Sequence, residues 1–111
     1  EDMIDYADPI IQKWPNVYKY SLGERMLTMM YEISELCTAA ELKHFKKTTL
    51  SDIDIKKAQL QKLVRRAHRT KYRDKSGGER LLLPTQSYAT WSAKIEEIGR
   101  ILGSWIKSVK S

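Results

Sequence analysis

The sequence is poor in the residue types on which several classes of small protein depend. It contains one cysteine, Cys37, so an internal disulfide is excluded and we expect a reducing, cytoplasmic setting. His44 and His68 stand far apart, and a single cysteine provides no zinc-ligand spacing. The sequence also lacks a glycine-rich phosphate loop and a set of side chains spaced for acid–base chemistry. We therefore expect no metal, no cofactor and no enzymatic activity.

Long hydrophobic runs are missing as well. No apolar stretch approaches the ~18 residues that a membrane span requires, and no signal peptide is visible, so we expect no membrane association. No segment of useful length alternates polar and apolar residues, which argues against a sheet. The 111 residues do contain 41% hydrophobic residues, enough for the core of a single domain over residues 1–111.

The clearest helical pattern lies at the end of the chain, over residues 84–111. Apolar side chains recur there at steps of three and four, which predicts one long helix with a broad buried stripe. Gly99 and Gly103 lie along one flank of the stripe, and each costs a helix interior about 1 kcal/mol. They favour a close helix contact, within the chain or between copies. The residues expected to pack in the bundle or between copies are Trp91, Ile98, Gly99, Leu102, Gly103 and Trp105.

Two helices are expected in the first half of the chain. The first covers residues 1–14, with Pro9 either at its first helical position or at a kink. A connector follows over residues 15–20. Ser21 and Glu24 then form an S-x-x-E capping box, which predicts a second helix that runs to about residue 44.

A third helix is expected after a polar loop over residues 46–50, with Ser51 as its cap. Residues 74–79 include two adjacent glycines and predict a break, and residues 81–83 are a short apolar clamp on the bundle. Four helices with short connectors predict an all-α fold, an antiparallel up-down four-helix bundle.

The charge of the chain is concentrated in one region. Residues 43–80 contain 13 Lys and Arg against 4 Asp and Glu, whereas the rest of the chain is slightly acidic. A solvated helix face usually mixes both signs, because like charges four residues apart repel. This stretch lacks such mixing, and its arginines suit bidentate contact with phosphate. The expected residues for nucleic-acid or partner binding are Lys62, Arg65, Arg66, Arg69, Tyr72 and Arg73. An ordinary solvated face is the alternative.

One stretch of the last helix is distinctive enough to indicate a family. The residues from Glu97 to Ile106, EIGRILGSWI, resemble the C-terminal helix of the accessory variability determinant proteins of diversity-generating retroelements. Leu22-Gly23-Glu24-Arg25, shortly after Trp14-Pro15, resembles the start of the second helix in that family. It is also similar to the related four-helix-bundle proteins of ribosomal RNA intervening sequences.

The resemblance implies more than the residues alone do. Proteins of this family are four-helix bundles that assemble as a barrel-shaped homopentamer with a basic exterior. They bind the reverse transcriptase of the retroelement and nucleic acid, RNA or DNA, and support mutagenic copying without being the polymerase. The expected partners are therefore a reverse transcriptase, RNA or DNA, and further copies of the chain. One alternative is a standalone RNA-binding bundle of the intervening-sequence type. Another is a structural oligomer whose basic face meets an acidic protein.

Overall fold

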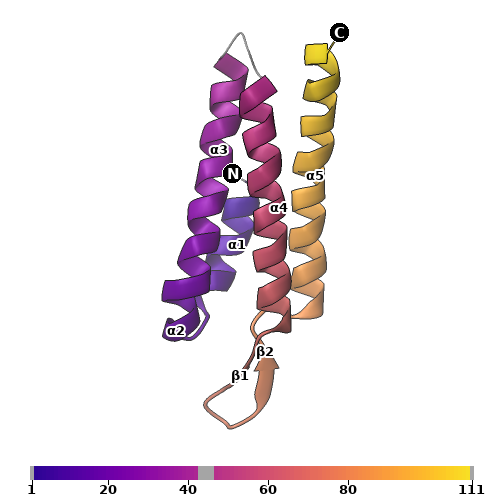
Figure 1. Cartoon of the computed structure of the whole chain (residues 1–111). Helices are drawn as coiled ribbons and strands as arrows, with labels where there is room; N and C mark the ends of the chain where they lie inside the picture. Colours follow the sequence, from indigo (N-terminus) through magenta and orange to yellow (C-terminus); the bar gives the residue numbers. More distant parts are fainter. Residues whose placement is uncertain (1, 43–46, 111) are drawn as a thin grey trace.

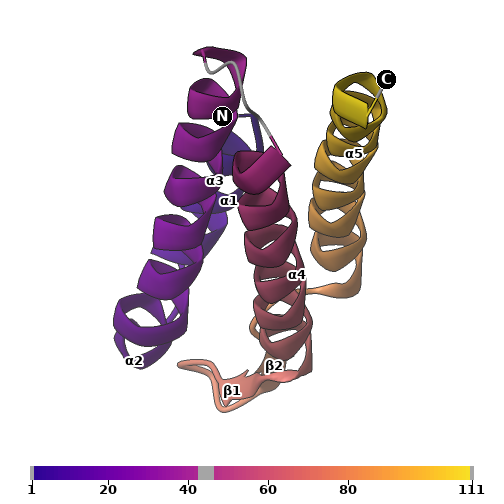
Figure 2. The same cartoon turned by 45° about the horizontal axis from the view of Figure 1, so that its top comes forward.

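Side by side along one axis, three long helices form the body of the part that the computed structural model describes, residues 2–42 and 47–110 (Figures 1 and 2). These helices are α3 (Glu24–Leu42), α4 (Lys47–Arg69) and α5 (Thr85–Lys110), and α4 packs against both of the others. At residues 2, 47, 106 and 108–110 only the backbone is described. The described chain measures 57 × 21 × 19 Å, so the bundle is about three times as long as it is wide.

The fourth helix, α1 (Asp2–Gln12), is short. It packs against α3 and α5 beside only one half of the bundle, the half nearer the loop between α4 and α5 (Figure 1). Pro9 lies inside α1. At 11 residues this helix extends about 16 Å, against about 39 Å for the 26 residues of α5. The predicted all-α four-helix bundle is confirmed, with unequal helix lengths.

Side chains at helical spacing form the core between these elements. From α1 they are Met3, Ala7, Ile11 and Trp14 just beyond its end, all buried. Burial of such side chains stabilises the fold by about 25 cal/mol for each Å² of apolar surface removed from water. The remaining core residues are Ile4, Met26, Met30, Ile33, Ala40, Leu50, Ile53, Leu60, Val64, Ala67, Leu82, Leu83, Trp91, Ile95 and Leu102.

The predicted connector before α3 is wrong, because the chain is already helical there. Helix α2 (Asn16–Tyr18) follows Pro15 directly and continues through the π-helical turn η1 (Lys19–Gly23) into α3. Proline suits the start of a helix, since its fixed φ is helical and its missing N–H is not needed there. Pro15 is therefore the N-cap of α2, and α1 has already ended at Gln12.

The capping box at Ser21 is wrong for the same reason. Ser21 lies within the π-helical turn, and its hydroxyl donates to the carbonyl of Val17 at 2.6 Å, one turn earlier. Gly23 is buried where α1 crosses this turn, and a Cβ there would lie 2.6 Å from Cγ2 of Ile11. A glycine is thus required by close approach of the two segments. The predicted end of this helix near residue 44 lies outside the described residues.

Helix α4 begins before its predicted cap. Its first helical residue is Lys47, so Ser51 lies within the first turns and does not start the helix. Leu50 is buried and continues the stripe of Ile53 and Leu60 toward the amino end. The burial of Leu50 explains why the helix reaches further than its polar residues suggested.

A small β-hairpin replaces the predicted unstructured break. Strands β1 (Lys71–Arg73) and β2 (Glu79–Leu81) pair antiparallel, with Tyr72 opposite Arg80. Asp74 Oδ1 accepts hydrogen bonds from the Ser76 hydroxyl and from two backbone amides of the turn, and Gly77 adopts φ +85°. Strands of three residues are too short to show period-two alternation. Beyond them, Leu82 and Leu83 pack into the core, as expected of the apolar clamp.

Candidate nucleic-acid interface

The basic residues predicted on α4 occupy its solvent-facing side. Leu60, Val64 and Ala67 are buried. At ~100° per residue, a residue two positions away from one of them lies about 200° around the helix axis, on the opposite side. The polar face opposite is therefore set by the apolar face. Four exposed cations of this face, at successive helical steps near the hairpin end, are Lys62, Arg65, Arg66 and Arg69.

These four side chains line one open groove. Leu63 and Thr70 complete its lining, and its volume is about 520 Å³. The Thr70 hydroxyl donates to the carbonyl of Arg66 at 2.7 Å and so closes the end of the helix. We call this feature the α4 groove. Its position at the carboxyl end of α4 also places positive charge where the helix dipole favours it.

Ion pairing divides the basic residues of the chain into two groups. Lys56 pairs with Glu32 across α3 and α4 at 2.7 Å, and Lys71 pairs with Glu79 in the hairpin at 3.4 Å. By contrast, within residues 2–42 and 47–110 no carboxylate forms an ion pair with Lys62, Arg65, Arg66, Arg69 or Arg73. A cluster of unneutralised cations attracts polyanions.

Two of the predicted binding residues lie apart from the α4 groove. Tyr72 is half-buried on β1 and lines a different cavity, described next, rather than the groove. Arg73 is exposed at the end of β1, opposite Glu79 in the strand register, and lines neither feature. The structure therefore brings four of the six predicted residues together and separates the other two.

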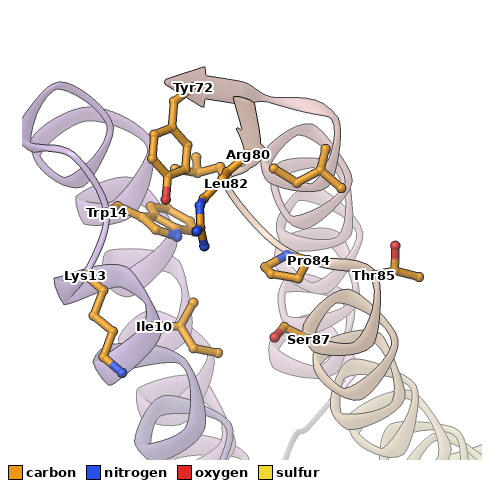
Figure 3. Close-up of a pocket in the computed structure, with 10 residues that line it drawn as sticks. Ile10, Lys13, Trp14, Tyr72, Arg80, Leu82, Pro84, Thr85 and Ser87 are labelled. Carbon is orange, nitrogen blue, oxygen red and sulfur yellow. The ribbon is translucent and has the colours of Figure 1, made fainter. Parts of the chain in front are cut away.

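The cavity that contains Tyr72 lies between the end of α1, the hairpin and the start of α5 (Figure 3). We call it the hairpin cavity. Its volume is about 560 Å³. Lys13, Trp14 and Arg80 join Tyr72 in its lining. These three residues could not be predicted as lining residues, because the amino-acid sequence does not show that residues 13, 14 and 80 meet. In the sequence, Trp14 was recognisable only as an apolar residue.

The expected packing residues of α5 fall into different environments. Trp91 and Leu102 are buried in the bundle, and Ile98 and Trp105 are half-buried. The three atoms nearest to a Cβ on Gly99 would all belong to the side chain of Lys57, at 3.4 Å or more. A Cβ on Gly103 would meet no described atom within 4 Å. Of the wider apolar stripe, the side chains of Ile106 and Val109 are outside the described residues.

A shallow apolar groove of about 280 Å³ lies between α1, α3 and α5, and Cys37 is part of its lining. Burial raises the pKa of the Cys37 thiol above its ordinary value of 9.0, and the nearby charge of Glu41 raises it further. The thiol is therefore protonated at neutral pH, which is typical of a packing residue and not of a nucleophile.

His68 is tied into the bundle by a hydrogen bond and a ring contact. Its Nδ1 lies 2.9 Å from the carbonyl of Leu83, and its ring stacks on Tyr88 at 4.3 Å between centroids. The stacked pair joins the carboxyl end of α4 to the start of α5. It therefore holds the two ends that frame the hairpin.

The described side chains contain no group of three His, Cys, Asp or Glu residues that could hold a metal ion. No helix in the described part of the chain has the length and hydrophobicity needed to cross a membrane.

The family is shown by comparison with known proteins. Residues 1–109 match a family model described as bAvd-like, which spans all the helices described above. No curated protein and no solved structure matches the chain. The match confirms the resemblance seen at residues 97–106 and at Leu22-Gly23-Glu24-Arg25. The chain therefore belongs to the bAvd-like family, an accessory type of protein.

Proposed function

We propose that the protein is a non-catalytic accessory subunit of a diversity-generating retroelement. It binds the reverse transcriptase and nucleic acid, template RNA or its cDNA, and so supports mutagenic reverse transcription. Family membership supplies the accessory role, and the α4 groove supplies the chemistry. The observation that carries the proposal is that its four cations are exposed and form no ion pair among the described residues.

The chemistry of the groove suits a phosphate backbone. Arginine presents a planar set of donors that can contact phosphate oxygens two at a time. Arg65, Arg66 and Arg69 offer three such heads within about one turn of helix, together with the compact charge of Lys62. Contacts of this kind position a nucleic acid without reading its sequence. We therefore assign the groove a sequence-tolerant role.

Assembly as a homopentamer is the second part of the proposal. Gly103 and Ile101 are exposed on α5, and Ile101 also lines the apolar groove beside α1 and α3. Such uncovered apolar and small residues suit a contact between copies. A pentamer would repeat the α4 groove by symmetry and carry about five times the +6 charge of one chain, which strengthens attraction of a polyanion.

The experiment is a salt titration of binding to single-stranded RNA. We expect the logarithm of the wild-type binding constant to fall steeply with the logarithm of the salt concentration. The triple variant Arg65→Gln, Arg66→Gln, Arg69→Gln should make this slope shallower by about 2, since each phosphate contact contributes about 0.7. The same preparations, co-purified with the reverse transcriptase at graded salt, report the protein partner.

A matched control removes the same charge elsewhere. Lys19, Arg25 and Lys75 lie on η1, α3 and the hairpin turn, and changing all three to Gln also lowers the net charge by three. The control should keep nearly the wild-type slope. Equal slopes for the two triple variants would show that total charge, and not the α4 groove, governs binding, and would overturn the assignment.

A further inference from the structure

We propose that the hairpin cavity is a pocket for one unpaired nucleotide of a bound RNA or single-stranded DNA. The inference rests on the proposed nucleic-acid role and adds a second, distinct site to it. The cavity and the α4 groove both lie near the carboxyl end of α4, where Thr70 and the hairpin follow the helix. A strand held by the groove is therefore close to the cavity.

The cavity contains a buried hydrogen-bond donor that has no partner. Trp14 is only 5% exposed, and its indole Nε1 is fully buried without a hydrogen bond in the described structure. Figure 3 shows this nitrogen turned toward the guanidinium of Arg80. An acceptor atom that reached both of these donors would satisfy them together. Buried polar groups are nearly always paired, so an orphan donor inside a cavity points to a ligand atom.

The charged groups of the cavity indicate an anion. Lys13 and Arg80 are the ionic side chains in its lining, and no carboxylate is part of that lining. Arg80 Nε donates a hydrogen bond to Asp74 Oδ2 at 2.5 Å, and Asp74 is not part of the cavity lining. That bond fixes the guanidinium and leaves its terminal nitrogens turned into the cavity (Figure 3). Acceptor oxygens satisfy these donors, and the charge of Lys13 favours oxygens that carry negative charge, as those of a phosphate do.

The rest of the lining is mostly apolar, with Thr85 and Ser87 as its polar members. The ring of Tyr72 faces the cavity beside Trp14, and Ile10, Leu82 and Pro84 form the remaining apolar wall (Figure 3). A cavity of about 560 Å³ is of the size that takes a small organic ligand. A nucleotide combines a flat aromatic base with an adjacent phosphate, and stacking on aromatic side chains is the usual way in which proteins hold unpaired bases. A carboxylate side chain of a peptide would satisfy the cations but leave the apolar wall uncovered.

The test compares two blunt-ended RNA duplexes that have no loop. In the first, 2-aminopurine is a single-nucleotide bulge; in the second, it is paired within the duplex. We expect the bulged RNA to bind about tenfold more tightly than the paired RNA. The emission of 2-aminopurine should change on binding only in the bulged RNA, because a paired base is already stacked in the helix. The double variant Lys13→Gln, Tyr72→Leu changes exposed or half-buried side chains and should abolish that preference while binding to the paired RNA stays within about twofold.

Two further variants separate this inference from the proposed function. Trp14→Phe removes the orphan donor together with part of the buried ring, and it should reduce the preference by several-fold; urea denaturation of this variant reports the accompanying loss of packing. The triple variant of Arg65, Arg66 and Arg69 should weaken the binding of both RNAs by the same factor, so the ratio of their affinities should not change. Equal binding of the two RNAs by the wild type would overturn the pocket and leave the α4 groove standing; no binding of either would overturn both. If a glutamate-rich peptide displaces the bulged RNA without displacing the paired one, the pocket takes carboxylates instead of nucleotides.

Discussion

Gly23 shows how a single residue fixes a helix crossing. A Cβ at this position would lie 2.6 Å from Cγ2 of Ile11, which is fully buried and cannot move aside cheaply. We expect Gly23→Ala to lower the free energy of unfolding by about 1–2 kcal/mol, because overpacking costs more than the helix propensity of alanine returns. Urea denaturation measures the change. An unchanged or higher urea midpoint would show that α1 shifts readily and that this crossing is not tightly packed.

Asp74 is the residue whose ionisation organises the hairpin turn. Hydrogen bonds from Ser76 and then from Arg80 lower the pKa of its carboxyl group from the ordinary 3.8 to about 2. Since the native pKa is the lower one, this contribution to stability is complete above pH 3.8 and is lost as the pH falls through about 2. NMR titration should find its midpoint near 2, and Ser76→Ala should raise it. A midpoint near 4 in the wild type would contradict the turn geometry.

At the scale of secondary structure, the hairpin depends on one glycine in the left-handed region. Gly77 has φ +85°, which costs other residues about 1–2 kcal/mol. We expect Gly77→Ala to open the turn about 5- to 30-fold more often, measured as faster hydrogen exchange of the Asp74 amide, which donates to the Gly78 carbonyl. Gly78→Ala is the matched control, because its added Cβ makes only ordinary contacts. Equal exchange in the two variants would contradict this assignment.

The sequence predicted the helices better than their ends. Apolar periodicity is a long-range pattern, so it found the helices that carry Ile11, Ile53 and Trp91. Their starts were misjudged, because Ser21 and Ser51 have the chemistry of caps but lie inside continuous helices. A cap depends on where the chain can continue to bury apolar residues, and this is a tertiary property.

The two candidate binding features also differ in whether they could be predicted from the sequence. The α4 groove could be predicted, because all four of its cations lie on one helix whose buried face is visible in the sequence. The hairpin cavity could not, since Trp14 and Arg80 are far apart in the chain and meet only through packing of α1 against the start of α5. Tyr72 was predicted as a binding residue without its surroundings, and the structure places it in the same cavity lining as Trp14.

For the whole molecule, the question is which side faces other copies. We propose that copies meet on the exposed flank of α5 that contains Gly103, because a Cβ on Gly103 would meet no described atom within 4 Å. In a single chain, Gly103→Ala should raise the free energy of unfolding by about 0.5–1 kcal/mol. If copies pack closely on this flank, the same change should weaken the assembly by about tenfold or more.

Sedimentation over a range of concentrations separates the two effects. Ser104→Ala, at the neighbouring exposed position, is the matched control and should leave the mass of the assembly unchanged. An assembly that is as strong with Gly103→Ala as in the wild type would place the contact elsewhere on the surface. A chain that stays monomeric at micromolar concentration would contradict the proposed pentamer altogether.

The π-helical turn between α2 and α3 has a consequence for every residue that follows it. In η1 the amide of Glu24 donates to the carbonyl of Lys19, five residues back, so this turn holds one residue more than an α-helical turn. Deleting one residue from Lys19–Gly23 would restore a regular repeat and rotate α3 by about 100° about its axis relative to α1. Met26, Met30 and Ile33 would then leave the centre of the bundle. A single surplus position thus sets the angular phase of the longest uninterrupted helical segment in the first half of the chain.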